Sequence, residues 1–204
     1  MKITKKQRNL LIALALGDGY ISKDGVLEIG HSLKQKEYLD YKYSLIKDFC
    51  NHPPKYKISK KYNYTTYVLH TKSLPFLKLL RRILYDSNGK KHITGKILNR
   101  LSLQELAIWW MDDGSMSKKI NKKTGNIKSL VFTLSTCISK EDNEKIIEFF
   151  YSKFSIKFGI RKMKNQYALI CGTKEGKKLS KLLYPYLIPS MQYKLFSESY
   201  PEME

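Results

Sequence analysis

Residues Leu10–Ser22 read LLIALALGDGYIS, and residues Leu106–Ser115 read LAIWWMDDGS. Each stretch is apolar over the length of a short helix and ends in an aspartate followed by a glycine. The first stretch follows a basic start, MKITKKQRN, so it also has the marks of a secretory signal peptide. However, its Ala13-Leu14-Ala15 step lies inside the apolar run, and a signal peptide has no second copy in mid-chain. The second copy favours a helix that delivers an aspartate to a functional site.

Both segments begin with the same helix start signal. Thr4 with Gln7, and Ser102 with Glu105, have the spacing of capping boxes. The helices that follow are apolar on nearly all sides, and such a helix must be buried on several faces. In one basic protein, two such helices can bury each other.

The segments after the two helices also match. A strand, a helix, a hairpin and a helix are predicted at Val26–Ser32, Gln35–Cys50, Lys55–Thr71 and Ser73–Tyr85. The same order returns at Ser129–Thr136, Ser139–Phe154, Ile156–Gly172 and Lys174–Tyr184, with the two hairpins turning near Asn63 and Asn165. If a short strand follows each Asp-Gly, the chain is a diverged tandem repeat of two αββαββα halves, residues 1–100 and 101–204. The predicted fold class is α+β with antiparallel sheets.

The charge of the chain is its most unusual property. The 204 residues are 42% hydrophobic, which is enough for a core, but 38 Lys and Arg against 18 Asp and Glu leave a net charge of +20. Because such an excess repels itself, it indicates a polyanionic partner. An anionic membrane is the rival partner, although no segment reaches the roughly 18 apolar residues of a spanning helix. A ribosomal-type basic protein without enzymatic activity also fits this composition.

The cysteines and histidines do not have the spacing of a metal site. Three cysteines are scattered, which fits neither a disulfide framework nor a zinc site, and we expect reduced core thiols. The histidines are isolated as well, so a transition-metal site of nitrogen and sulfur ligands is not expected. These residues are Cys50, Cys137, Cys171, His31, His52, His70 and His92.

Alternation along the predicted strands separates an apolar face from a polar, basic one. Lys55–Ser59, Leu130–Ser135 and Ile156–Arg161 all alternate, and Tyr56 and Ile58 are expected to pack on helices. For any one strand, a solvated sheet face is the simpler interpretation. Two such sheets in a protein of charge +20 favour a nucleic-acid groove, since a β-ribbon fits the major groove. The expected DNA contacts are Glu28, His31, Ser32, Lys34, Lys55, Lys57, Ser59, Lys61, Tyr67, Lys128, Thr133, Ser135, Lys157, Arg161 and Lys164.

The two aspartates indicate a hydrolytic site. If the helices pack together, Asp18 and Asp113 lie side by side at their ends, next to glycines that permit close backbone approach. Paired carboxylates repel less with a hard divalent cation between them, and Mg²⁺ is held by carboxylates, phosphate oxygens and water. Such a cluster suits attack by water on a phosphodiester. The alternative is that each aspartate merely ends its helix.

These residues resemble the paired signature helices of LAGLIDADG homing endonucleases in the single-chain form. The resemblance rests on LIALALGDG and LAIWWMDDG, with bulkier or different residues at several motif positions. The segments NGKKHIT and LLYPYLIPSMQYKL are similar to the omega-intron type of this family. The resemblance covers nearly the whole chain. It implies signature helices packed at the centre and sheets that form a DNA-binding saddle.

The resemblance also implies roles for individual residues. It identifies Asp18 and Asp113 as metal-binding catalytic residues, with Gly17 and Asp112 as their neighbours in the metal site. It aligns Lys91 and Lys194 with active-site lysines, which can stabilise developing charge or orient the attacking water. Mg²⁺ is the implied cofactor, with Mn²⁺ as a substitute and Ca²⁺ binding without cleavage.

The implied activity is sequence-specific cutting of both strands of a long DNA site with staggered ends, by a monomer. The family also contains RNA-splicing maturases, whose partner is intron RNA, and DNA-binding regulators that no longer cut. Retention of both acids argues against the regulator but does not separate endonuclease from maturase. The reassigned opening stretch predicts an intracellular protein of an organelle, a bacterium or a phage-infected cell.

Overall fold

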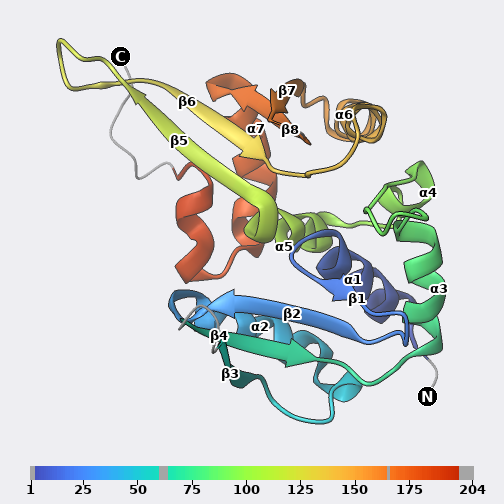
Figure 1. Ribbon diagram of the computed structural model, residues 1–204. Helices are drawn as coiled ribbons and strands as arrows, with labels where there is room; N and C mark the ends of the chain where they lie inside the picture. Colours follow the sequence, from blue (N-terminus) through green and yellow to red (C-terminus); the bar gives the residue numbers. More distant parts are fainter. Residues whose placement is uncertain (1–2, 60–63, 165, 198–204) are drawn as a thin grey trace. The chain divides into compact units, whose positions relative to one another are not determined.

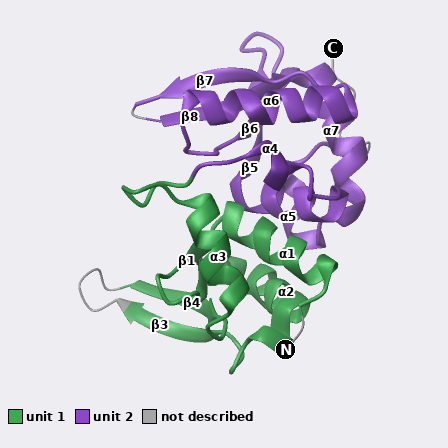
Figure 2. Cartoon of the chain, turned by 90° about the vertical axis from the view of Figure 1, so that its right-hand side faces the viewer, with its two compact units in different colours: residues 1–91 green, residues 92–204 purple. Residues whose placement is uncertain are grey.

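The computed structural model describes residues 3–59, 64–164 and 166–197, and the chain divides into two compact units, residues 1–91 and 92–204 (Figure 2). The elements of the first unit are α1 (Lys5–Leu16), β1 (Tyr20–Ile21), β2 (Leu27–Ser32), η1 (Leu33–Gln35), α2 (Lys36–Ile46), η2 (Lys47–Phe49), β3 (Lys55–Ser59), β4 (Tyr64–His70) and α3 (Pro75–Leu84). Those of the second unit are α4 (Gly95–Leu98), α5 (Leu103–Asp113), β5 (Gly114–Ile120), β6 (Ile127–Leu134), α6 (Lys140–Phe154), β7 (Gly159–Met163), β8 (Gln166–Gly172), α7 (Thr173–Leu183), η3 (Tyr184–Tyr186) and η4 (Pro189–Lys194).

Each unit contains one αββαββα repeat, as the sequence predicts (Figure 1). The first sheet has the strand order β1-β2-β4-β3 and the second β5-β6-β8-β7, and all pairs are antiparallel. The contact boundary between the units lies at Lys91 and His92. The division of the repeats at residue 100 stays a prediction.

The signature helices begin and end as local chemistry predicts. Thr4 caps α1 in a capping box with Gln7, and the backbone N–H of Ser102 donates to the Glu105 carboxylate at 2.9 Å. Residues 9–16 of α1 and 105–111 of α5 are buried. The opening apolar stretch is thus a buried helix of the first unit.

Alternation along the central strands sets the core of each unit. In the second unit, Leu130, Phe132 and Leu134 of β6 are at most 2% exposed, as predicted. In the first unit, however, Tyr56 and Ile58 of β3 are 61% and 69% exposed, so the prediction that they pack on helices is wrong. The reason is that β3 is the edge strand of its sheet, and α2 contacts the inner strands β2 and β4.

The three cysteines lie in different surroundings, and none forms a disulfide. Burial raises the pKa of the Cys50 thiol to about 11 and that of Cys171 to about 12, so both stay protonated core thiols at neutral pH. Cys137 is exposed, and the prediction of a core thiol is wrong there. It lies in the connection from β6 to α6 with φ +55°, a turn conformation that keeps its side chain out of the core.

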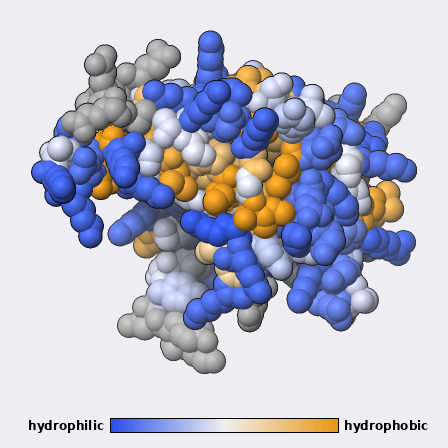
Figure 3. Space-filling view, turned by 90° about the horizontal axis from the view of Figure 1, so that it is seen from above, coloured by the Kyte–Doolittle hydropathy of each residue, from blue (hydrophilic) through white to orange (hydrophobic). Residues whose placement is uncertain are grey.

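The surface is largely polar. Hydrophilic side chains cover most of the face in Figure 3, and a hydrophobic area lies near its middle. Within the described part of the chain, no helix combines the length and the apolar character that crossing a bilayer requires.

Close packing of α7 on its sheet gives a test of the second unit. A Cβ added at Gly176 would overlap the Phe132 ring, whereas one added at Gly172 would meet nothing within 4 Å. We expect Gly176→Ala to lower the free energy of unfolding by about 1–3 kcal/mol, because the core must shift to admit the methyl group. Gly172→Ala is the matched control. Urea unfolding of both variants measures the difference, and equal stability would contradict this packing.

Candidate active site

At both Asp-Gly turns the glycine N–H returns to a carbonyl of the signature helix, five residues back in α1 and four residues back in α5. Gly17 ends α1, and the N–H of Gly19 donates to the Leu14 carbonyl at 2.9 Å. In the other repeat, the N–H of Gly114 donates to the Trp110 carbonyl. A Cβ at Gly19 or Gly114 would collide with the carbonyl that accepts this hydrogen bond. Glycine is therefore required after each aspartate, because the chain turns from helix to strand directly over the last helical turn.

A lysine from the end of each repeat reaches back to its signature helix. The Lys91 Nζ donates to the Gly17 carbonyl at 2.6 Å and lies 3.5 Å from the Leu16 carbonyl. The Lys194 Nζ donates to the carbonyls of Met111 at 2.5 Å and Asp112 at 3.0 Å. These carbonyls are repeat-related, and they lack helical partners because the helix ends there. Each lysine therefore lies within its own repeat, next to the aspartate of that repeat.

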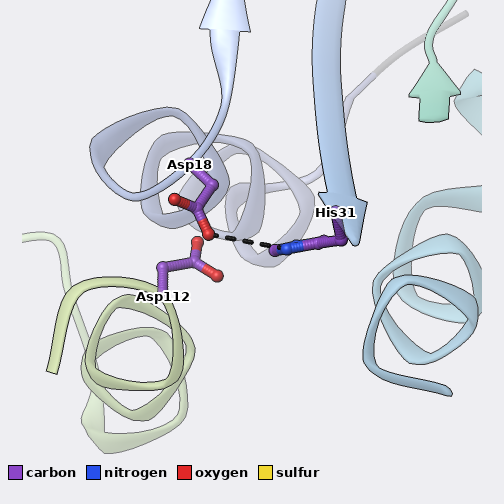
Figure 4. A group of neighbouring side chains, drawn as sticks. All are labelled: Asp18, His31 and Asp112. Atoms are coloured by element: carbon purple, nitrogen blue, oxygen red, sulfur yellow. Dashed lines mark ion pairs between the residues drawn. The ribbon is translucent and has the colours of Figure 1, made fainter. Parts of the chain in front are cut away.

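The aspartate of the first unit lies beside a buried histidine. The Asp18 side chain is 40% exposed, and its Oδ2 lies 3.8 Å from Nδ1 of His31, whose side chain is 3% exposed (Figure 4). The His31 Nδ1 is also 3.2 Å from Oε1 of Gln35. On the other side of the ring, Nε2 lies 2.9 Å from the Nζ of Lys42, which is fully buried.

The aspartate of the second unit has a different nitrogen donor. The indole Nε1 of Trp109, one turn earlier on α5, donates to Oδ2 of Asp113 at 2.9 Å. The preceding residue, Asp112, is half-buried and also ends α5. Both units thus present partly exposed carboxylates with a side-chain nitrogen close to them.

These oxygen groups fit a hard divalent cation. Carboxylates are the protein ligands that Mg²⁺ prefers, and Asp18, Asp112 and Asp113 remain partly accessible to water. The carbonyls of Gly17 and Asp112 already accept hydrogen bonds from the lysines. A carbonyl oxygen has two lone pairs, so one that accepts from a lysine can also bind a cation.

Most of the residues predicted to contact DNA are exposed or half-exposed, and their contact with DNA stays a prediction. Lys57 and Glu28 lie on the sheet face away from α2, with Nζ and Oε1 3.8 Å apart, and His70 lies 3.2 Å from the same carboxylate. In the second unit, the Arg161 guanidinium lies 3.5 Å from the hydroxyl of Thr133, which is itself 7% exposed. The other exposed or half-exposed residues are Ser32, Lys34, Lys55, Lys128, Ser135 and Lys164.

For His31 and Tyr67, the prediction of an exposed side chain that contacts DNA is wrong. They are 5% and 6% exposed, and they lie on the face that packs against α2, where the Tyr67 hydroxyl donates to Asp40 at 3.0 Å. The reason is strand parity, because His31 continues the row of Leu27 and Ile29.

Three further expected contacts differ from the rest. Lys157 precedes β7 and lies beside α6 and α7: its Nζ is 5.7 Å from the Tyr151 ring centre, and its N–H donates to Glu175. Its place among the helices is at odds with a role on the sheet face. Lys61 and the side chain of Ser59 lie outside the described residues.

Sequence reasoning missed the close neighbours of the aspartates. Trp109 was available as a signal, because a residue four positions before Asp113 lies on the same helix face. Alternation along β2 puts His31 on the same face as Leu27 and Ile29, which is the face toward the helices. Helical periodicity puts Lys42 on the buried stripe of Tyr38 and Ile46, but the usual preference of lysine for solvent argues against burial there.

Residues 8–179 match the sequence profile of the LAGLIDADG DNA endonuclease family. The chain belongs to this family. A solved structure, the homing endonuclease I-WcaI bound to its DNA recognition sequence, is 30% identical with a TM-score of 0.79, over 96% of this chain and 88% of that one. The two-repeat LAGLIDADG fold is therefore shared along nearly the whole chain.

Two curated relatives extend the comparison. A probable intron-encoded endonuclease 1 of Wickerhamomyces canadensis is 30% identical over 95% of this chain and 85% of its own length. A protein RecA of Mycolicibacterium flavescens is 27% identical over 95% of this chain and 47% of its own length. The LAGLIDADG chain thus spans about half the length of that RecA protein.

The two lysines should stabilise the fold as well as the site. We expect Lys91→Met and Lys194→Met each to lower the free energy of unfolding by about 1–3 kcal/mol, because the helix-end carbonyls lose a charged donor. Exposed neighbours, Lys90→Met and Lys181→Met, are the controls. Chemical denaturation measures all four, and test variants as stable as their controls would show that these hydrogen bonds do not hold the helix ends.

Proposed function

We propose that this LAGLIDADG chain is a DNA endonuclease that recognises a long duplex site and cuts both strands with staggered ends. The observation that carries the proposal is the repeated arrangement of carboxylate, glycine turn and lysine at the ends of α1 and α5. A basic sheet face in each repeat supports DNA as the substrate, as does the solved relative that is bound to its DNA recognition sequence.

Asp18 and Asp113 are proposed to hold Mg²⁺, with Asp112 and the Gly17 carbonyl as additional oxygen ligands. That the two signature helices bury each other and bring the two acids together stays a prediction from their all-round apolar sequences. When bound, the metal supplies Lewis acidity and an activated water at neutral pH. Mn²⁺ is expected to replace it, and Ca²⁺ to bind without cleavage.

Charge stabilisation and DNA binding are proposed to be carried out by side chains of the protein. The amines of Lys91 and Lys194 lie at the helix ends, where each can stabilise negative charge that develops on the phosphate. The sheet faces bind the duplex and set its register. Contacts to phosphates fix position, and side chains at base edges, such as Glu28 and Arg161, select the sequence.

A selection for cleavage tests the proposal directly. The purified protein is incubated with a randomised DNA library and Mg²⁺, and the cut molecules are sequenced, which gives the site and the stagger together. We expect cutting by a monomer, with activity linear in protein concentration. Activity that needs intron RNA would instead favour a maturase, and binding without cutting would favour a DNA-binding protein of the same fold.

Substitution of the two acids should separate cutting from binding. Asp18→Asn and Asp113→Asn are expected to slow double-strand cleavage by about 100-fold or more, because a charged metal ligand is lost. DNA binding in Ca²⁺ should survive, since it rests on the strands. Lys91→Met and Lys194→Met should slow cutting less, about 10-fold.

The readouts are thermal melting, site affinity and cleavage rate on the same preparations. Wild-type cleavage by either Asn variant, or loss of folding and binding together with activity, would sink the mechanism. The matched control is Asp86→Asn, which changes an exposed acid whose carboxylate accepts from the backbone of its own loop.

Binding should depend steeply on salt. For about six to ten phosphate contacts, affinity is expected to fall about 10³- to 10⁵-fold between about 50 and 200 mM salt, because bound cations are released from the DNA. Fluorescence anisotropy on the selected site measures the slope. A flat profile would point away from a polyanion as the partner.

A further inference from the structure

Lys42 is a lysine in the core of the first unit. It lies on α2 and is 0% exposed, and its Nζ lies 4.4 Å from the centre of the Tyr38 ring, which is fully buried as well. Lysine is almost never fully buried without a partner, and burial of an amine costs free energy that an apolar side chain of the same length would not. The nearest ring nitrogen is Nε2 of His31, at 2.9 Å.

This contact determines which nitrogen of His31 carries the proton. With Lys42 in its charged form, the ammonium group has hydrogens to donate and no lone pair, so Nε2 is the acceptor. The remaining proton of a neutral imidazole is then on Nδ1. That nitrogen faces two oxygen acceptors, Oε1 of Gln35 at 3.2 Å and Oδ2 of Asp18 at 3.8 Å. Lys42, Gln35 and Asp18 thus fit the same tautomer.

We propose that Lys42 is a positioning residue for the cleavage centre: it fixes His31 in the tautomer whose Nδ1–H faces Asp18, and so orients that carboxylate. The inference rests on the proposed function of Asp18 as a metal ligand. It deepens that function by assigning two residues that do not touch the substrate. Partners of this kind commonly change metal affinity or activity by about 10- to 100-fold when they are lost.

In the second repeat, the nitrogen beside the aspartate needs no positioning residue. The donor to Asp113 is the indole of Trp109, and an indole nitrogen is a donor only. It needs no partner to set its tautomer. The first repeat uses an imidazole, which can present either a donor or a lone pair, and therefore needs Lys42 behind it.

The alternative is that Lys42 only satisfies its own buried amine and has no effect on Asp18. Both views predict that the pair exists, but they differ in what its loss does. If the pair is only structural, Lys42→Met changes stability, while cleavage and DNA binding change only as far as folding does. If it positions Asp18, cleavage falls while thermal melting and site affinity stay close to wild type.

The first experiment reads the tautomer without reference to activity. Protein labelled with ¹⁵N-histidine is examined by long-range ¹H–¹⁵N correlation, with the His31 signals assigned from His31→Asn. We expect His31 in the Nδ1–H form in the wild type and in the control Lys47→Met, which removes an exposed lysine just after α2. Lys42→Met should shift the ring toward a mixture of both tautomers. An Nε2–H ring in the wild type, or no shift in Lys42→Met, would overturn the proposal.

The second experiment measures cleavage of a plasmid that carries the selected site. Lys42→Met should cut about 10-fold more slowly. Nicked circles should accumulate, with the nicks mostly on one strand, because only the aspartate of the first repeat is disturbed. Lys47→Met should cut at the wild-type rate. Equal rates for Lys42→Met and wild type, at equal melting temperature, would contradict a positioning role.

A pair of His31 variants covers the case in which Lys42→Met does not fold. The amide nitrogen of Asn can replace a donor at the Nδ1 position, so His31→Asn should retain more cleavage than His31→Ala at similar site affinity. Equal losses in the two variants would overturn the proposal.

Failure of the proposed endonuclease function can be distinguished from failure of the Lys42 proposal. A wild-type protein that never cuts DNA, yet shows the Nδ1–H ring and its loss in Lys42→Met, would refute the endonuclease and retain the Lys42–His31 pair. Titration with Mn²⁺ alone adds a direct test of the site. Selective broadening of the His31 signals supports a cation at Asp18, whereas unchanged signals with a metal-dependent cleavage activity would place the cation elsewhere and remove the basis of the proposal.

Discussion

The last carbonyls of a helix have no partner within the helix. In each repeat of this protein, the aspartate and the lysine of the candidate site lie next to these carbonyls. The C-terminal end of a helix carries partial negative charge, so a carboxylate placed there is unfavourable by itself. A lysine amine from the end of the repeat meets the carbonyls, and an N–H from a neighbouring side chain meets the carboxylate. If Asp18 and Asp113 act as proposed, these oxygen groups bind a cation.

The two repeats keep this scheme and differ in how they complete it. The glycine turn and the lysine are common to both, because they depend on backbone groups that any helix end provides. The nitrogen beside the aspartate is not common to both: it comes from β2 in one repeat and from α5 itself in the other. Duplicated halves can diverge in the side chains around a shared backbone arrangement, since only the hydrogen-bonding property has to be kept.

Local signals predicted the order of elements well, because capping residues and strand alternation act over a few residues. Thr4, Ser102 and Ser139 each cap the helix that the sequence assigns to them. The errors come from facts that local sequence does not contain. Tyr56 is exposed because β3 is at the sheet edge, and strand order is a property of the whole sheet. For the site, the repeat predicted the aspartates and the family resemblance predicted the lysines, whereas a buried Lys42 contradicts the usual preference of lysine for solvent.

The two sheets differ in the length of their first strand. β1 has two residues, whereas β5 has seven and forms a long hairpin with β6 (Figure 1). A register shift near its outer end adds a further local irregularity. If the sheets read DNA as proposed, the hairpin covers more base pairs than β1 does, so the two half-sites differ in length and information content. The preferred target is then no palindrome, and the protein binds it in a single orientation, which fixes in advance which strand faces which aspartate.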